Sequence, residues 1–201
     1  MLSNYLISLI KAQLPFEPNE QQNDLLEALG QFMMVHEKRK IFLLKGYAGT
    51  GKTSVVGALV RALNNIGQKT VLLAPTGRAA KVFANYSGSP AFTIHKKIYR
   101  QKSLTDFHFQ LAENLSSDVL FIVDEASMIS NTDFDSVFGS GRLLDDLMEY
   151  VFSGRNCSLI LLGDTAQLPP VGQAESPALD VNYMEQYQVK IFEFTLTHVV
   201  R

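Results

Sequence analysis

The chain has 201 residues, of which 46% are hydrophobic and 19% are charged, and its formal net charge is −2. This composition is typical of a globular protein with enough chain for one large domain and a substantial core. The small negative charge excludes a surface that is basic throughout, so any nucleic-acid site has to be a local patch. The single cysteine, Cys157, cannot form an internal disulfide, which predicts a reduced, cytoplasmic protein.

Residues 1–37 predict two helices that lead into a domain at residues 38–201. The first helix has apolar residues at helical spacing, without a basic leader or a small-residue cleavage site, which indicates a docking helix rather than a signal peptide. Asn19 is the predicted N-cap of the second helix, whose apolar face comprises Leu25, Leu26, Leu29, Phe32 and Met33. No apolar run approaches membrane-spanning length, so no membrane partner is expected.

A repeated pattern of strand, loop and helix follows. Apolar runs predict strands at 41–44, 70–74, 119–123, 158–162 and 190–195. Helices are predicted at 52–65, 77–85, 93–99 and 143–152. Strands that are apolar throughout are typical of parallel sheets covered on both faces. The predicted fold class is therefore α/β, with an open, mainly parallel sheet between helices, and such sheets bind ligands at the carboxyl ends of their strands.

The stretch "GYAGTGKTS" fits the phosphate-loop pattern G-x-x-x-x-G-K-[ST] between a predicted strand and a predicted helix. Glycines let the backbone N–H groups turn inward around phosphate oxygens, and the start of the helix adds about half a positive charge. A lysine supplies a full charge, and a hydroxyl can ligate Mg²⁺. The predicted nucleotide-binding residues are Gly46, Ala48, Gly49, Thr50, Gly51, Lys52, Thr53 and Ser54. The alternative is a glycine-rich turn with an exposed lysine.

Two carboxylates, Asp124 and Glu125, stand at the end of the buried run in "FIVDEAS". Burying two carboxylates costs several kcal/mol each unless a cation or strong donors compensate. Mg²⁺ would compensate, with Thr53 and Asp124 as its protein ligands and Glu125 orienting or deprotonating the attacking water. The alternative is a solvated pair that caps the next helix. ATP and Mg²⁺ are therefore the expected cofactors.

Gln167 follows the strand end Gly163–Asp164 and precedes the rigid pair Pro169–Pro170. In a parallel sheet this strand end lies at the same edge as the phosphate loop and Asp124, so that an amide able to donate and accept would reach the γ-phosphate and its attacking water. Gln167 would thus sense the γ-phosphate, and because the two prolines stiffen the backbone, a movement of Gln167 on hydrolysis would be transmitted along the loop. The alternative is a surface turn with a chance glutamine.

Six stretches in this order, "GYAGTGKTS", "APTGRAAK", "TIH", "VDEAS", "GDTAQLPPV" and "LTHVVR", resemble the motifs of the first RecA-like domain of superfamily 1 helicases. The resemblance is closest to the RecD-like branch and extends from about residue 19 to residue 201. It implies a P-loop NTPase fold and an ATP-dependent DNA helicase or translocase motor. The Gln-Leu-Pro-Pro and Thr-Gly-Arg-Ala-Ala forms are similar to the branch that moves 5′→3′ on single strands.

The resemblance also implies roles for residues outside the phosphate loop. A glutamine three residues after a Thr or Ser reads the adenine edge in this family; here the spacing selects Gln22, with Asn19 in place of the hydroxyl and Gln21 as the alternative. Arg201 matches the arginine that contacts the γ-phosphate, which makes it a catalytic candidate with Lys52, Glu125 and Gln167.

The resemblance also implies single-stranded DNA as the partner, with RNA as the alternative. Backbone amides and hydroxyls at strand ends suit phosphate contact without reading sequence. The positions that match the family's single-strand track are Pro75, Thr76, Arg78, Thr93 and His95. A core or capping histidine is the alternative for His95, and a solvated helix charge is the alternative for Arg78.

A small β-hairpin is expected near residues 100–117, where Phe107, Phe109 and Leu111 alternate with polar residues. In RecD-like enzymes a hairpin here separates strands; aromatic side chains that only pack on the domain are the alternative. The family also needs a second RecA-like domain, which this chain does not encode, so a piece of a longer protein is expected.

Two rival functions remain open from the sequence. A PhoH-like ATPase shares "AGTGKT" and a Gly-Asp-x-x-Gln turn, but typically has Ala-Gln after the first acidic residue and lacks Thr-Gly-Arg-Ala-Ala. A nucleotide-binding module without helicase activity would not need Glu125 and Gln167.

Overall fold

The computed structural model describes residues 2–101, 108–131, 137–164, 166–167 and 176–199. Its centre is a six-stranded sheet in which every pairing is parallel, with strand order β3-β2-β6-β7-β1-β8. The strands are β1 (Lys40–Gly46), β2 (Lys69–Ala74), β3 (Ala91–Thr93), β6 (Val119–Val123), β7 (Ser158–Gly163) and β8 (Lys190–Leu196). The predicted α/β fold with a parallel sheet is confirmed.

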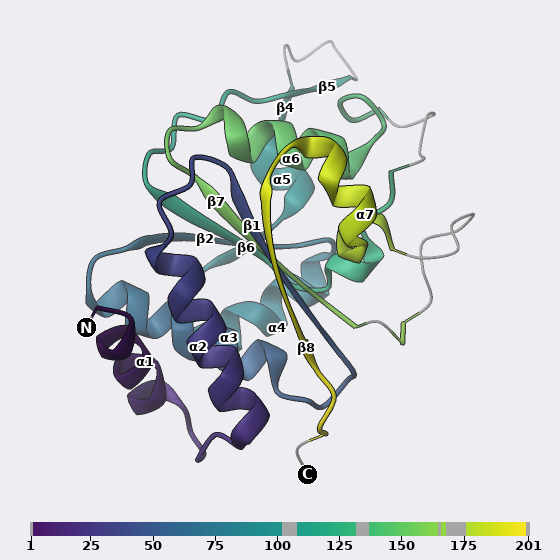
Figure 1. Cartoon of the computed structure of the whole chain (residues 1–201). Helices are drawn as coiled ribbons and strands as arrows, with labels where there is room; N and C mark the ends of the chain where they lie inside the picture. The colour runs from purple at the N-terminus through teal and green to yellow at the C-terminus, as the bar shows by residue number, and fades with distance from the viewer. Residues whose placement is uncertain (1, 102–107, 132–136, 165, 168–175, 200–201) are drawn as a thin grey trace.

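Helices cover both faces of this sheet (Figure 1). One face carries α1 (Leu2–Gln13), α2 (Glu20–Met34), α3 (Lys52–Asn65) and α4 (Gly77–Ser87). The other carries α5 (Ile94–Ile98), α6 (Leu143–Ser153) and α7 (Val181–Met184), with the short 3₁₀ turns η1 (Ala126–Met128), η2 (Pro177–Leu179) and η3 (Glu185–Tyr187). Each face has its own hydrophobic core, and the side chains of the central strands alternate between the two.

Local sequence explains where the helices beside the site begin. Asn19 forms a capping box with Gln22 at the start of α2, so that the side chain of each bonds the backbone N–H of the other. Thr76 caps α4 by accepting a hydrogen bond from Ala79 N at 3.2 Å. These caps define the first residues of α2 and α4, two helices on the same face of the sheet as α3.

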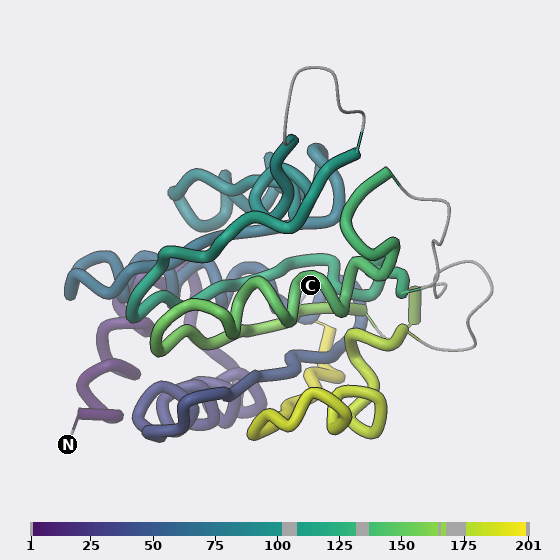
Figure 2. The backbone as a smooth tube through the Cα atoms, turned by 90° about the horizontal axis from the view of Figure 1, so that it is seen from above, coloured from purple at the N-terminus to yellow at the C-terminus, as the bar shows by residue number. Residues whose placement is uncertain are grey.

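A separate two-stranded sheet pairs β4 (Tyr99–Gln101) with β5 (Phe109–Leu111) antiparallel, with Tyr99 opposite Leu111. It lies beyond α5 and α6 rather than in the central sheet, and Figure 2 shows its strands projecting from the main body. Phe107, which the sequence placed in this hairpin, lies outside the described residues. The role of the hairpin in strand separation stays a prediction.

The sequence prediction differs from the structure mainly at the edges. The edge strand β3 was not predicted, because three residues give no readable alternation, and neither was the four-residue helix α7. Helix α4 extends two residues beyond its predicted end, to Ser87, where Gly88 adopts φ +68° and ends it. Among the described residues, no helix has the length and apolarity needed to cross a membrane.

Candidate functional site

The strand ends that carry the sequence motifs are neighbours in space. Strand β7 lies between β6 and β1, with Val123 opposite Leu161 in one pairing and Lys45 opposite Gly163 in the other. The loops after β1, β6 and β7 therefore leave the same edge of the sheet side by side. This arrangement brings Lys52, Asp124, Glu125 and Gln167 to one pocket.

The phosphate loop requires glycine at two tightly packed positions. At Gly46 (φ +157°) a Cβ would stand 2.4 Å from Leu196 O, and at Gly51 (φ +88°) it would stand 2.8 Å from the Gln22 amide nitrogen. At Gly46 the obstacle is backbone, so a side chain there would require backbone movement, and at Gly51 the positive φ disfavours a side chain in addition to the contact with Gln22. The end of β8 and the start of α2 thus press on the loop from outside and help to hold its shape.

Lys52 is held inside the loop that it closes. Its Nζ donates hydrogen bonds to Gly46 O and Tyr47 O, both at 2.8 Å. Burial lowers the pKa of Lys52, while the charges of Asp164, Asp124 and Glu125 oppose this shift. The ammonium is therefore positioned at the loop by carbonyl acceptors that a phosphate group can replace.

Asp124 is buried at 6% exposure and has few partners for a carboxylate. It accepts hydrogen bonds from Thr53 Oγ1 at 3.1 Å and from Glu125 N at 2.9 Å. Burial raises its pKa, more than these hydrogen bonds and Lys52 lower it. A hydroxyl beside an under-compensated buried carboxylate fits a hard cation such as Mg²⁺, which favours oxygen ligands and keeps several waters.

The described residues contain no cluster of three or more His, Cys, Asp or Glu that would hold a metal by protein ligands alone. A magnesium ion at Thr53 and Asp124 would therefore depend on phosphate oxygens and water for its other ligands. This is the coordination expected where the metal arrives with the nucleotide.

Glu125, Gln167 and Ser127 form a hydrogen-bonded chain at the pocket. Gln167 Nε2 donates to Glu125 Oε2 at 3.0 Å, and Ser127 Oγ donates to Gln167 Oε1 at 2.7 Å. Glu125 adopts the left-handed conformation, with φ +55°, which is uncommon outside glycine and turns its side chain toward the pocket. The amide that the sequence assigned to a sensor thus contacts the carboxylate that it assigned to the base.

The two glutamines at the start of α2 bond within the protein. Gln22 is 1% exposed, and its Nε2 donates to Thr50 O at 3.3 Å. Gln21 accepts hydrogen bonds at Oε1 from Thr197 N at 2.8 Å and from His198 N at 3.0 Å. Adenine contact by either residue stays a prediction, since neither lines the nucleotide pocket among the described residues.

The pocket has a volume of about 450 Å³ and extends beyond the phosphate loop. Sequence reasoning missed Phe16, Val82, Tyr86 and Asp164, which line it, and Ser127, which holds Gln167. Asp164 was recoverable from its place at a strand end beside Gly163. Phe16 and Tyr86 gave no sequence signal, because only the packing of α1 and α4 against α3 brings them to the loop.

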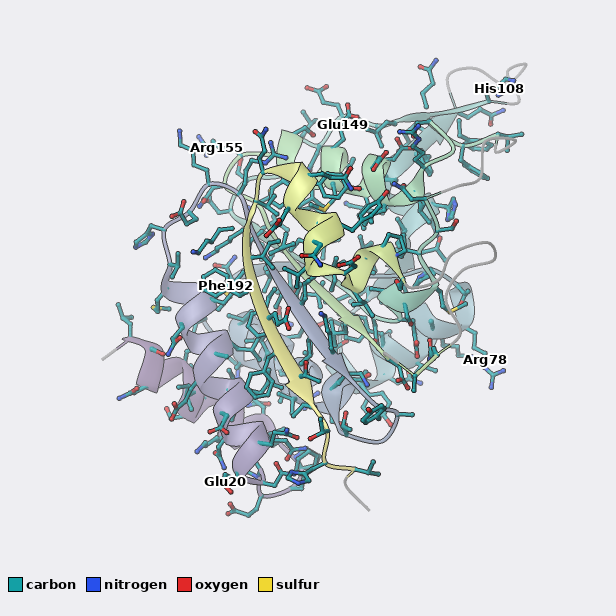
Figure 3. The ribbon with its side chains drawn as sticks, turned by 45° about the vertical axis from the view of Figure 1, so that its right-hand side comes forward. Glu20, Arg78, His108, Glu149, Arg155 and Phe192 are labelled. Carbon is teal, nitrogen blue, oxygen red and sulfur yellow. The ribbon has the colours of Figure 1, made fainter. Side chains whose placement is uncertain are left out.

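The predicted single-strand contacts fall into two groups. Thr76 and Arg78 line a second hollow of about 330 Å³, which also includes Asp124, Glu125 and Gln167. Arg78 is exposed at the start of α4 and points away from the molecule (Figure 3). Pro75 immediately precedes Thr76 at the end of β2. These three residues therefore lie at the edge of the sheet that carries the nucleotide pocket.

Thr93 and His95 lie at the start of α5, near the hairpin. Thr93 caps the helix by accepting from Lys96 N at 3.2 Å. His95 is half-buried, with its ring 5.0 Å from that of Phe138, and burial lowers its pKa. These contacts account for both residues structurally, and DNA contact by either stays a prediction. Arg201 and Pro169–Pro170 lie outside the described residues.

Comparison with known proteins identifies the family to which this chain belongs. The model of an AAA domain matches residues 17–201. The chain belongs to this AAA domain family. The match covers the phosphate loop, the Asp124–Glu125 pair and Gln167, which are the residues that the pocket brings together.

Proteins similar to this chain include helicases. The chain is 30% identical over 154 residues to the ATP-dependent RecD2 DNA helicase of Deinococcus radiodurans, a match that covers 76% of this chain and 18% of that protein. It is 30% identical over 151 residues to the ATP-dependent DNA helicase dda of enterobacteria phage T4, covering 72% of this chain and 31% of the relative. The resemblance to the first RecA-like domain of RecD-like helicases is confirmed, and the chain spans less than a third of either relative.

A solved structure shows the same fold. The crystal structure of the Pif1 helicase from Candida albicans aligns with 92% of this chain and 41% of that chain, with a TM-score of 0.55 and 18% identity. At this identity the likeness concerns the arrangement of strands and helices. It agrees with the parallel sheet and its helical layers described above.

Proposed function

We propose that this AAA domain is the nucleotide-hydrolysing half of an ATP-dependent DNA helicase or translocase that moves 5′→3′ on single strands. The observation that supports this most directly is the continuous set of contacts at the ends of β1, β6 and β7. Thr53 bonds Asp124, Asp124 accepts from Glu125 N, and Gln167 bonds Glu125. A module that only binds nucleotide has no need of a carboxylate and an amide held together beside the phosphate loop.

The residues have separate roles in hydrolysis. The Lys52 ammonium would bond phosphate oxygens of ATP in place of its carbonyl partners. Thr53 and Asp124 would hold Mg²⁺, which would neutralise phosphate charge when bound. Glu125 accepts a proton from the attacking water, and Gln167 orients that carboxylate through its amide. Arg201, which lies outside the described residues, is the proposed contact of the γ-phosphate. ATP and Mg²⁺ are thus the proposed cofactors, and the protein is a cytoplasmic ATP hydrolase.

The proposed DNA contacts lie at the same edge of the sheet as the hydrolytic residues, which would couple DNA binding to ATP hydrolysis. Thr76 and Arg78 share a hollow with Glu125 and Gln167, so a single strand bound at the start of α4 would lie next to the hydrolytic residues. Pro75, Thr93 and His95 complete the proposed track. Unwinding additionally requires a second RecA-like domain that closes on the nucleotide and alternates its grip with this one.

The test compares ATP hydrolysis with and without single-stranded DNA in a protein that carries both RecA-like domains. We expect DNA to raise the rate severalfold, and we expect Arg78→Ala to reduce this increase while leaving the rate without DNA unchanged. Lys11→Ala, on the exposed outer face of α1, is the matched control. A rate that single-stranded DNA does not change would contradict a helicase motor and favour the PhoH-like or binding-module alternative. A strand-displacement assay on the 201-residue chain alone should show no unwinding.

A further inference from the structure

The turn after the acidic pair carries a buried polar side chain that has no role in the proposed chemistry. Ser127 lies in η1 and is 2% exposed, and its Oγ donates to Gln167 Oε1 at 2.7 Å. Among the described residues, Ser127 lines neither the nucleotide pocket nor the hollow beside it. A buried hydroxyl needs a partner within the protein, because leaving it unpaired is costly. Ser127 can therefore act on the reaction only through Gln167.

The amide of Gln167 has two ends of similar shape and opposite character. Its nitrogen only donates hydrogen bonds and its oxygen only accepts them, whereas an ionised glutamate only accepts. The bond from Nε2 to Glu125 Oε2, at 3.0 Å, therefore requires the amide oxygen to face away from Glu125. Ser127 donates to that oxygen. Glu125 and Ser127 together thus select one orientation of the amide.

Ser127 is itself held in place by the packing of η1. A Cβ on Gly163 would be 3.0 Å from Ser127 N, so the turn lies directly against the end of β7. Further along the same segment, Asn131 is 6% exposed. Its Nδ2 donates to Asp145 Oδ1 and to Tyr183 Oη, both at 2.8 Å. The turn is therefore fixed to the sheet on one side and to α6 and α7 on the other.

Gln167, in contrast, is exposed to solvent. Its backbone N donates to Asp164 O at 3.4 Å, which is long for a hydrogen bond. An exposed glutamine has many rotamers, and holding one of them costs conformational entropy. The two hydrogen bonds at its amide offset this cost, and one of them comes from Ser127.

We propose that Ser127 is a positioning residue for Gln167, because its hydroxyl holds the amide oxygen and thereby keeps the amide nitrogen on Glu125. This inference rests on the proposed function, in which Gln167 orients the carboxylate that takes a proton. It adds a residue that contacts neither nucleotide nor DNA. Without this hydroxyl, Gln167 populates other rotamers, and turnover falls while the affinity for ATP is retained.

The first measurement is steady-state ATP hydrolysis by Ser127→Ala in the protein that carries both RecA-like domains, with saturating single-stranded DNA. The kcat should fall by about fivefold, the effect of one ordinary hydrogen bond. The KM for ATP should stay within about twofold of the unsubstituted value, because a group that does not touch the nucleotide adds no uniform binding. This unequal effect on kcat and KM is not expected from a general loss of folded protein.

A double substitution tests whether Ser127 acts through Gln167. Gln167→Ala removes the amide, so that the Ser127 hydroxyl no longer has anything to position. Adding Ser127→Ala to Gln167→Ala should therefore change kcat by less than about twofold, since residues that act as one unit are not additive. A further loss of about fivefold in this background, as expected for independent sites, would overturn the inference.

Ser127→Cys separates the hydrogen bond from the packing of the turn. A thiol fills the space of the hydroxyl but is a weak donor, so this variant should lose turnover nearly as Ser127→Ala does. A cysteine variant with the unsubstituted rate would show that volume matters rather than the hydroxyl, and the inference would be wrong. Ser87→Ala is the matched control, because Ser87 is 0% exposed and donates to Phe83 O within its own helix at 2.8 Å. It should leave both kcat and KM unchanged.

The remaining outcomes distinguish this inference from the function on which it rests. If DNA stimulates hydrolysis and Ser127→Ala keeps the unsubstituted kcat, the inference is wrong and the proposed function stands. If Ser127→Ala raises KM as much as it lowers kcat, Ser127 supports the nucleotide pocket and not Gln167, and the inference is again wrong. If the unsubstituted protein hydrolyses no ATP, the proposed function itself is wrong.

Discussion

Two buried aspartates, Asp124 beside the phosphate loop and Asp146 on α6, meet very different surroundings. Asp146 is 4% exposed and accepts from Tyr99 Oη at 2.6 Å, from Ser140 Oγ at 2.7 Å and from Ser140 N at 2.9 Å. Asp124, at 6% exposure, has one hydroxyl and the N–H of its own neighbour. Three donors thus satisfy Asp146, whereas Asp124 has two and lies at the pocket that the proposed Mg²⁺ site shares.

The different surroundings of the two aspartates indicate that Asp146 serves the stability of the fold and Asp124 serves the chemistry of the pocket. Around Asp146, Tyr99, Phe109 and Phe138 pack together, with the rings of Phe109 and Phe138 stacked at 4.7 Å, and the base of the hairpin is fixed. Burial, followed by the contact with Asp146, raises the pKa of Tyr99, so its hydroxyl remains a donor. Around Asp124, the polar groups face a pocket instead. Changes near Asp124 should alter nucleotide chemistry, and changes near Asp146 should alter folding.

The largest expected effect is on turnover at Glu125. Glu125→Gln should lower the rate of ATP hydrolysis by about 10²–10⁴-fold, because an amide cannot take the proton of the attacking water. ATP affinity should be retained. Phosphate release in the protein with both RecA-like domains measures the first quantity and nucleotide titration the second, with Glu149→Gln on the outer face of α6 as control. Hydrolysis at the unsubstituted rate would remove Glu125 from the proposed chemistry.

Asp146→Ala should produce the largest loss of stability. It leaves Tyr99 Oη and two donors of Ser140 without their acceptor, at a cost of about 3 kcal/mol in the free energy of unfolding. Affinity for ATP should not change. Denaturant unfolding and nucleotide titration of the 201-residue chain give both values. An equal loss of ATP affinity would show that the two regions are not independent.

Lys52→Ala should weaken ATP binding by about 100-fold, since the loop loses its charge-assisted bonds to phosphate oxygens. Stability should change much less, because Lys52 Nζ bonds only loop carbonyls that water can satisfy. Titration with ATP and Mg²⁺ measures the effect, and Lys11→Ala is the control. An ATP affinity equal to that of the unsubstituted chain would contradict the role given to this lysine.

Gln167→Ala should have a smaller effect, of about tenfold on DNA-stimulated turnover. The variant removes one hydrogen bond to Glu125 but leaves the carboxylate and the phosphate loop in place. ATP binding should stay within about twofold of the unsubstituted protein, whose pocket contacts are otherwise unchanged. Equal losses of affinity and turnover would instead make Gln167 a simple binding residue.

The smallest expected effect is a pH dependence of stability at Asp124. Burial raises the pKa of this carboxyl above its value in the unfolded chain, so ionised Asp124 opposes folding at neutral pH, and this cost disappears as pH falls through the raised pKa. Without Mg²⁺, Asp124→Asn should therefore be more stable than the unsubstituted chain at pH 7, and the difference should shrink toward pH 4. Thermal unfolding across this range measures the trend, and a difference that grows on acidification would contradict it.

The sequence by itself determined the parts of this protein that depend on local pattern. Continuous apolar runs fixed the parallel strands, because strands buried on both faces need no polar alternation. The phosphate-loop spacing placed Gly46 to Ser54 between β1 and α3, because a tight loop followed by a helix start requires glycines and Lys-Thr in that order. The acidic pair was found because buried carboxylates at a strand end are otherwise costly, and Gln167 was found because a glutamine before the rigid pair Pro169–Pro170 is not explained by a turn.

Tertiary structure decided which polar groups are already satisfied. Gln21 and Gln22 are neighbours with the same amide, yet one bonds the exit of β8 and the other the phosphate loop. The contacts of Asp146 with Tyr99 join residues 47 positions apart, which no local pattern reveals. Side-chain chemistry can be read from a sequence, but its availability to a ligand depends on partners that only folding brings together.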